Sequence, residues 1–382
     1  NPDLATYNIE AHNNEAFKIT AAINPLSEQE LLSFLQCGAF LRHPDGRVFL
    51  WQGPFQADYR NKSQLAQLEF FSESLKYLSS PMGFRCFSVP QVQALQNQLQ
   101  SISKLPSWNF NSANFDDFAN SFQRILEKIN AGAIDKALPV VFSKAFADKA
   151  PTANEKAYLM KSALQVPSAL WVYGFWDKDE GIIGATPEYL FLSNQQGTQS
   201  MALAGTCPDK EMGQRPPLLQ DQKELHEHQL VVQDIQSRLQ RFGRVQTEPI
   251  RELALPGLKH LQTLMHLDFV PDASELVNDM HPTPALGVSP RSYGYRWMQD
   301  LPQQQERKWH GGVFLFDVGE FQVALVCIRN MMWSRLNQNT DGPKIELKIG
   351  AGCGLVQDSQ LEREWGEVLL KINSVKRILG IT

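Results

Sequence analysis

The spacing of apolar positions along the chain predicts a mixture of helices and strands. Apolar residues recur every three or four positions, as on one face of a helix, in the segments 27–36, 62–78, 91–102, 115–130, 154–164, 224–239 and 361–379. Runs typical of strands cover 39–51 (a hairpin turning at Asp45-Gly46), 136–146, 169–176, 181–185, 189–193, 261–268, 312–318 with 321–333, 344–350 and 354–356. Long antiparallel strands with helices outside them favour an α+β sandwich.

A stretch rich in proline, serine and asparagine, 106–114, is the best candidate for a linker. It separates an N-terminal segment, 1–110, from a larger region, 111–382. We expect the first segment to complete the sandwich formed by the second, so that the chain folds as one compact domain. No internal repeat or low-complexity tract indicates another organisation.

The composition narrows the class of protein. The chain has 382 residues, of which 43% are hydrophobic, and a formal net charge of -5, so it can bury a large core and has no basic footprint for nucleic acid. No run of 18 apolar residues predicts a membrane-spanning helix, and the first residues do not resemble a signal peptide. The five cysteines are scattered without a Cys-x-x-Cys pair, which favours a reducing compartment. We therefore expect a cytoplasmic protein with no membrane or nucleic-acid partner.

Two of the predicted helices carry a pair of glutamates on one face. Glu224 and Glu227 are three residues apart, as are Glu364 and Glu367, and Lys371 continues the second face. Two such edges can clamp a hard divalent cation such as Mg2+, which prefers a few carboxylates and leaves positions for an anionic substrate. If one pair stood alone, the better interpretation would be an ordinary one, a solvated charged face or acidic residues matching a helix dipole.

Zinc is disfavoured by the spacing of the histidines beside the first glutamate pair. His226 and His228 are one residue apart and point to different sides of a helix. The helical zinc motif instead needs two histidines four residues apart. A zinc hydrolase is therefore the remotest interpretation.

Further motifs stand in a fixed order along the chain: Gly184-Ala-Thr-Pro-Glu-Tyr-Leu-Phe, Leu203-Ala-Gly-Thr, Glu224-Leu-His-Glu-His, Leu264-Met-His-Leu, His281-Pro-Thr-Pro-Ala, Val326-Cys-Ile-Arg, and Ala351-Gly-Cys-Gly followed by Glu364-Trp-Gly-Glu and Lys371. In this order and with these separations the chain, from about residue 115 onward, resembles the chorismate-utilising enzymes. These are the anthranilate, aminodeoxychorismate, isochorismate and salicylate synthases. The resemblance implies a four-layer α-β-β-α sandwich of the anthranilate synthase component I type, with Mg2+ and chorismate bound between its sheets.

The resemblance also assigns roles to residues at the matching positions. Glu227 and Glu367 would hold the metal directly, and Glu224 and Glu364 directly or through water. Arg329 would bind the enolpyruvyl carboxylate of chorismate, which suits a bidentate guanidinium on an otherwise apolar strand; an arginine reaching out from a strand edge is the alternative. The rest of the implied substrate site consists of Ala204, Gly205, Thr206, His266, Gly352, Gly354 and Lys371.

Three positions indicate the reaction within the family. Water-adding members carry a lysine as base at the start of the first core strand, where this chain has Lys136, whereas ammonia-adding members typically carry glutamine. Glu188 would be the acid that protonates the leaving C4 hydroxyl, with a pKa raised by burial. Ala204 stands where many aminodeoxychorismate synthases have a nucleophilic lysine. These residues indicate an isomerase that converts chorismate to isochorismate, as in siderophore or menaquinone biosynthesis.

Other functions stay open on the sequence alone. Salicylate synthase shares the same lysine and glutamate, and an ammonia-using enzyme would need a separate glutamine amidotransferase as partner. A second register places Pro139 instead of Lys136 at the position of the base. Trp309, Phe314 and Cys353 depart from the family pattern, with the Trp309 indole expected to replace a phenol as donor. A non-catalytic chorismate-binding protein is therefore a further alternative.

Overall fold

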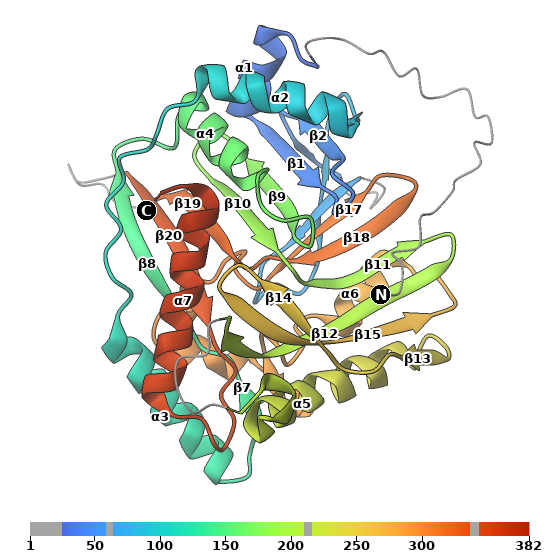
Figure 1. Cartoon of the computed structure of the whole chain (residues 1–382), viewed down its shortest axis with the longest axis vertical. Helices are drawn as coiled ribbons and strands as arrows, with labels where there is room; N and C mark the ends of the chain where they lie inside the picture. Colours follow the sequence, from blue (N-terminus) through green and yellow to red (C-terminus); the bar gives the residue numbers. More distant parts are fainter. Residues whose placement is uncertain (1–24, 59–63, 210–215, 337–343, 382) are drawn as a thin grey trace.

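Two antiparallel β-sheets packed against each other form the centre of the molecule (Figure 1). The computed structural model describes residues 25–58, 64–209, 216–336 and 344–381. The eight-stranded sheet follows the order β6-β2-β1-β9-β10-β19-β20-β8. Its strands are β1 (Gly38–Arg42), β2 (Val48–Gln52), β6 (Phe84–Phe87), β8 (Val140–Ala147), β9 (Trp171–Trp176), β10 (Gly181–Thr186), β19 (Asn330–Arg335) and β20 (Ile345–Gly352).

The ten-stranded sheet follows the order β13-β15-β12-β11-β18-β17-β4-β5-β3, with β14 paired to β15. Two short strands, β7 (Lys136–Ala137) and β16 (Val288–Ser289), pair separately. The strands of the ten-stranded sheet are β3 (Gln56–Ala57), β4 (Leu65–Leu68), β5 (Lys76–Ser79), β11 (Tyr189–Asn194), β12 (Gly197–Pro208), β13 (Val245–Thr247), β14 (Arg251–Leu255), β15 (Leu258–Leu267), β17 (Val313–Asp317) and β18 (Phe321–Val326). Both sheets therefore contain strands from the first 110 residues.

Helices complete a four-layer α-β-β-α arrangement, so the predicted fold class is confirmed. Helices α1, α2, α3, α4 and α7 pack on the eight-stranded sheet, and α5 and α6 pack on the ten-stranded sheet. None of the helices in the described ranges is both long and apolar enough to cross a membrane. The helices are α1 (Glu28–Gln36), α2 (Val89–Ile102), α3 (Phe115–Asn130), α4 (Ala153–Ala163), α5 (Gln222–Leu239), α6 (Ala273–Met280) and α7 (Leu361–Leu379).

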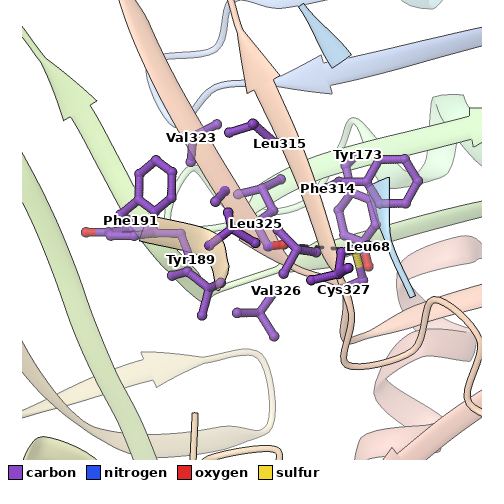
Figure 2. Packing of buried hydrophobic residues seen from close by; sticks show 14 of the residues in the cluster. Leu68, Tyr173, Tyr189, Phe191, Phe314, Leu315, Val323, Leu325, Val326 and Cys327 are labelled. Carbon is purple, nitrogen blue, oxygen red and sulfur yellow. Dashed lines mark hydrogen bonds between the residues drawn. The ribbon is translucent and has the colours of Figure 1, made fainter. Parts of the chain in front are cut away.

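The main hydrophobic core lies between the two sheets. Tyr173 of β9 packs against Phe314 of β17 in the other sheet, with ring centroids 6.0 Å apart (Figure 2). Leu325 and Val326 of β18 are buried in the same cluster. Because successive side chains of a strand point to opposite faces, the outer face of the eight-stranded sheet is also apolar, and it forms a second core with its helices.

Local signals explain the elements that the sequence predicts best. The helix predicted at 115–130 is α3, whose first amides donate to the Asn114 side chain. The helix predicted at 361–379 is α7, which ends at Gly380 in the left-handed conformation. The hairpin around Asp45-Gly46 is β1 and β2. These elements are confirmed with bounds within a residue or two of the prediction.

The helix predicted at 62–78 is wrong, although its first two residues lie outside the described part. Leu65, Leu68, Leu75 and Leu78 have helical spacing, yet they belong to β4, β5 and the turn between them. All four residues of β4 are buried, and Leu68 pairs with Val313 of β17, far away in sequence. A partner that distant leaves no trace in a local periodicity.

Two predicted strands are each interrupted. The strand at 136–146 is divided into β7 and β8 by Leu138 and Pro139. Pro139 has no N–H to donate to a ladder. The strand at 321–333 is divided into β18 and β19, which belong to different sheets. Arg329, in this break, has a φ of 53°, a left-handed conformation that no strand residue adopts.

A stability prediction concerns Arg42, which is buried at the end of β1. Its guanidinium donates hydrogen bonds to four backbone carbonyls at the end of α4 and in the loop that follows. Because Arg42→Met leaves these carbonyls without their donor, we expect it to lower the free energy of unfolding by about 3 kcal/mol in urea denaturation. Arg47→Met is the matched control, since a half-exposed ion pair contributes less than about 1 kcal/mol. Equal losses in the two variants would contradict the assignment. The carbonyls that accept from Arg42 are those of Leu164, Val166, Pro167 and Leu170.

Candidate active site

A pocket lies where the chain passes from one sheet to the other. The turn between β10 and β11 joins the two sheets and carries Glu188, and the connection between β18 and β19 does the same and carries Arg329. Backbone hydrogen bonds of 3.1 Å join the two crossings, from Val326 N to Glu188 O and from Ala185 N to Arg329 O. Both side chains therefore reach the same pocket.

The pocket brings together most of the residues that the sequence singles out. It contains about 640 Å³ of space not filled by atoms, including its opening to solvent. The predicted residues in its lining are Glu188, Ala204, Gly205, Thr206, Glu227, Arg329, Gly352, Gly354, Glu367 and Lys371. Three more, Lys136, Glu224 and Glu364, lie behind this lining.

The carboxylates predicted to bind a metal converge on one buried ammonium group between α5 and α7. Lys223 Nζ lies 2.9 Å from Glu364 Oε1, 3.3 Å from Glu224 Oε1 and 3.4 Å from Glu227 Oε2. Arg363 adds a second cation, 2.8 Å from Glu224 Oε1. Burial raises the pKa of Glu224 and Glu364, and Lys223 opposes the rise. The lysine is therefore the local counter-ion of three carboxylates.

This donor set fits a hard divalent cation. The carboxylate oxygens already surround a positive charge, and Glu364 Oε2 is buried without a hydrogen-bond partner. Glu367, which pairs with Lys371 over 2.7 Å, adds a fourth carboxylate at the pocket wall. In the described ranges no three His, Cys, Asp or Glu side chains stand in a ready metal-binding arrangement, and Lys223 lies among these carboxylates. An ion would have to replace this ammonium contact.

Lys136 is fully buried and its ammonium lies 3.0 Å from Glu227 Oε1. Burial raises the pKa of Glu227, but Lys136 and Lys223 outweigh it and lower that pKa to about 2. The strand that carries Lys136 pairs with Ser289 of β16 instead of the main sheet. Pro139 falls in the break that follows, so the side chain that meets the carboxylates comes from position 136.

Glu188 is a buried carboxyl group that keeps its proton at neutral pH. Only 3% of the residue is exposed. Burial raises its pKa to about 8, although Lys136 and Lys371 favour the ionised form. A protonated carboxyl group facing a pocket can act as a general acid.

Arg329 is held by a chain of buried hydrogen bonds. Its Nη2 donates to His260 Nε2 over 3.0 Å and its Nη1 to Ser374 Oγ over 3.3 Å. Burial lowers the pKa of Arg329 to about 10 and that of His260 well below its usual value, so the arginine is a cation and the histidine is neutral. Because His260 Nε2 accepts, Nδ1 carries the proton and donates to Thr206 Oγ1 over 2.9 Å.

Glycines let the strand before α7 approach Lys136 and Glu227 closely. Alternate positions of an extended chain face the same side, and on the pocket side they are glycine. A side chain at Gly354 would collide with Glu227 Oε1 and with Lys136 Cε, and one at Gly352 would collide with the Pro139 carbonyl. These steric limits explain why the Ala-Gly-Cys-Gly motif has glycine at positions 352 and 354.

The structure does not bring His266 to the pocket. It lies on β15, pairs with Glu248 over 2.7 Å, and its side chain is 35% exposed. His260, six residues earlier and on the same face of the strand, lines the pocket instead, roughly 20 Å away along an extended chain. The motif at 264–267 led to the prediction of His266, whereas His260 is the histidine on this face of β15 that lines the pocket.

The three departures from the family pattern lie outside the pocket lining. Trp309 packs in the inter-sheet core against Phe175 and Phe314, with centroids 6.0 and 6.2 Å away. Cys353 is buried in the core on the helix side of the sheet. The indole therefore does not reach the pocket as the expected donor, whereas the next residue, His310, which the sequence analysis did not single out, lines it.

The comparison with known families agrees with this geometry. The family described as "chorismate binding enzyme" matches residues 86–380. The chain belongs to this family. The resemblance noted from the motifs is thereby confirmed, and the match extends about 30 residues further toward the N-terminus than the motifs did.

Relatives in this family include several isochorismate synthases. The salicylate biosynthesis isochorismate synthase of Pseudomonas aeruginosa is 32% identical over 214 residues, which are 52% of this chain and only 42% of that protein. The vibriobactin-specific isochorismate synthase of Vibrio cholerae is 24% identical over 316 residues, 77% of this chain and 73% of that one. A putative 2,3-dihydroxybenzoate-specific isochorismate synthase from Bacillus anthracis has the same fold, with a TM-score of 0.71 at 20% identity over 93% of this chain and all of that one.

The buried pair of Lys136 and Glu227 allows a test that does not depend on activity. Lys136→Met leaves the carboxylate with Lys223 alone, so we expect the free energy of unfolding at pH 7 to fall by roughly 2 kcal/mol. The double variant Lys136→Met, Glu227→Gln should recover part of that loss, because it removes the uncompensated charge. Urea denaturation of both variants gives the comparison, and a double variant less stable than the single one would argue against a buried ion pair.

Proposed function

We propose that this protein converts chorismate to isochorismate in a Mg2+-dependent reaction. Water adds to ring carbon 2 while the hydroxyl on carbon 4 leaves. The observation that carries the proposal is the meeting, in one pocket, of a protonated Glu188, the Arg329 cation and Glu227. Lys136 lies behind the lining, 3.0 Å from Glu227 Oε1. Family membership and the relatives named as isochorismate synthases support it.

The pocket residues divide the proton transfers between them. In the proposed step Lys136, as a neutral amine, takes a proton from the attacking water and becomes an ammonium, and Glu188 gives its proton to the oxygen on carbon 4, so that this oxygen leaves as water. Lys136 lies behind the pocket lining, next to Gly354, and Glu188 enters from the β10–β11 turn. The acid and the base therefore come from different elements, as a reaction with two separate proton transfers requires.

Arg329 and the metal site would hold the two carboxylates of chorismate. The guanidinium has the charge and the fork geometry to pair with the enolpyruvyl carboxylate. Glu227 and Glu367, with Glu224 and Glu364 beside them, would hold Mg2+, which when bound would neutralise and orient the ring carboxylate. Lys371, fixed by bonds to Glu367 and to the Gly352 carbonyl, adds a positive charge at this end.

The structure around Ala204 is consistent with water as the nucleophile. Ala204 lines the pocket and presents only a methyl group, so no covalent lysine adduct can form there. The proposed base, Lys136, lies 3.0 Å from Glu227 Oε1. Salicylate synthase and ammonia-using enzymes keep the same pocket in outline, and the products distinguish them.

The decisive experiment incubates the protein with chorismate and Mg2+, with and without ammonium, and identifies the products. We expect isochorismate in both reactions and none when EDTA removes the metal. Salicylate with pyruvate would keep the water mechanism and change the name of the enzyme. An amino product formed only with ammonium would refute the role of Lys136, and chorismate binding without turnover would leave a binding protein.

The raised pKa of Glu188 predicts a pH dependence. The carboxyl group acts only when protonated, so kcat/KM should be high below its pKa and fall as pH rises through about 8. Glu188→Gln should lower kcat by at least about 100-fold and remove this limb. A profile with no decrease between pH 7 and pH 9 would show that another group is the acid. Glu180→Gln, outside the pocket, serves as the control.

A further inference from the structure

His310 is a pocket residue to which neither the motifs nor the proposed mechanism gives a role. It is buried, with 2% of its surface exposed, and its ring lines the pocket. A side chain at Gly350 would come within 2.8 Å of His310 Nδ1, so this glycine lets the imidazole lie against the sheet. Phe142 holds the ring from the side in an edge-to-face contact, with centroids 5.8 Å apart.

The surroundings of His310 determine which nitrogen carries its proton. Burial and Arg307 lower the pKa of His310 to about 3, although the Asn330 side chain favours the charged form, so the ring is neutral. His310 Nδ1 and Asn330 Oδ1 are both buried without a hydrogen-bond partner of normal geometry. The Asn330 amide nitrogen already donates to Tyr173 and to the Cys327 carbonyl. The remaining amide oxygen can only accept, which favours a proton on Nδ1 and a free lone pair on Nε2.

His310 also lies at the opposite end of the pocket from the carboxylates. A Cβ at Gly350 would meet His310, while one at Gly354, four residues later along the chain, would meet Glu227 and Lys136. Four extended residues span about 13 Å. In chorismate the ring carboxylate on carbon 1 and the hydroxyl on carbon 4 are on opposite sides of the ring. With the carboxylate at the Glu227 end, the hydroxyl faces His310.

We propose that His310 Nε2 accepts a hydrogen bond from the C4 hydroxyl of the substrate, in the tautomer that Asn330 fixes. The inference rests on the proposed function and names the contact that selects a hydroxyl at this position. When the C4–O bond breaks, its electron pair goes to the oxygen, which takes the proton of Glu188 and leaves as water. The original hydroxyl hydrogen stays directed at Nε2, so His310 gains no proton.

Binding to two ligands tests the contact directly. The ligands are chorismate and a 4-deoxy analogue that keeps both carboxylates, each titrated calorimetrically with Mg2+ present. We expect the wild type to prefer chorismate by about tenfold, the effect of one hydrogen bond in a buried site. His310→Phe should abolish the preference, and His310→Gln, whose amide oxygen reaches a similar place, should retain most of it. His281→Gln, at a histidine bonded to the Phe70 carbonyl outside the pocket, is the control.

Nitrogen-15 NMR of histidine-labelled protein tests the tautomer. The expected result is a protonated Nδ1 and an unprotonated Nε2 for His310, with this preference lost in Asn330→Ala. A protonated Nε2, or an equal loss of affinity for both ligands in His310→Phe, would overturn the proposal. Should that variant not fold, the wild-type preference and the wild-type spectrum decide. A wild type that binds both ligands equally refutes only this inference, whereas one that binds neither refutes the proposed function.

Discussion

The site depends on two places where the chain leaves one sheet and enters the other. Glu188 and Arg329 lie at these crossings, and their main-chain carbonyls accept hydrogen bonds from Val326 and Ala185 of the opposite crossing. A strand that stayed in one sheet would send alternate side chains into the two cores. Because the crossings are bonded to each other, an acid and a cation from distant parts of the chain face one pocket. The left-handed conformation of Arg329 is part of that turn.

The second constraint is the free-energy cost of burying four glutamates near this pocket. An isolated carboxylate loses several kcal/mol of hydration when it leaves water. Here Lys223 contacts three of the four carboxylates and Lys371 pairs with the fourth. The glycines before α7 make the arrangement possible, because they leave room for Glu227 and Lys136 to meet against the strand. The small residues of the Ala-Gly-Cys-Gly motif are therefore needed for the pairing of Glu227 with Lys136.

The sequence predicts those features that local chemistry determines. The acidic faces of α5 and α7 follow from three-residue spacing, and the bounds of α3 follow from its cap and its apolar stripe. The prediction from sequence fails where contacts with residues far away in the chain determine the local structure. Residues 65–78 have helical spacing but form strands through β17, and β12, twelve residues long, has no alternating apolar pattern that would have predicted it. His260 and His266 share one strand face, and only the tertiary structure shows which reaches the pocket.

Burial also shifts the pKa values of four titratable groups that line the pocket, Glu188, His260, His310 and Arg329. It raises the pKa of Glu188 above neutrality and lowers those of His260 and His310 far below it. It lowers the pKa of Arg329 as well, but from so high a value that the cation persists. At neutral pH the same desolvation thus favours a protonated Glu188 and neutral His260 and His310, while Arg329 stays charged. A dianionic ligand would meet donors and acceptors whose roles are already fixed, because the crossings that carry Glu188 and Arg329 keep these groups away from water.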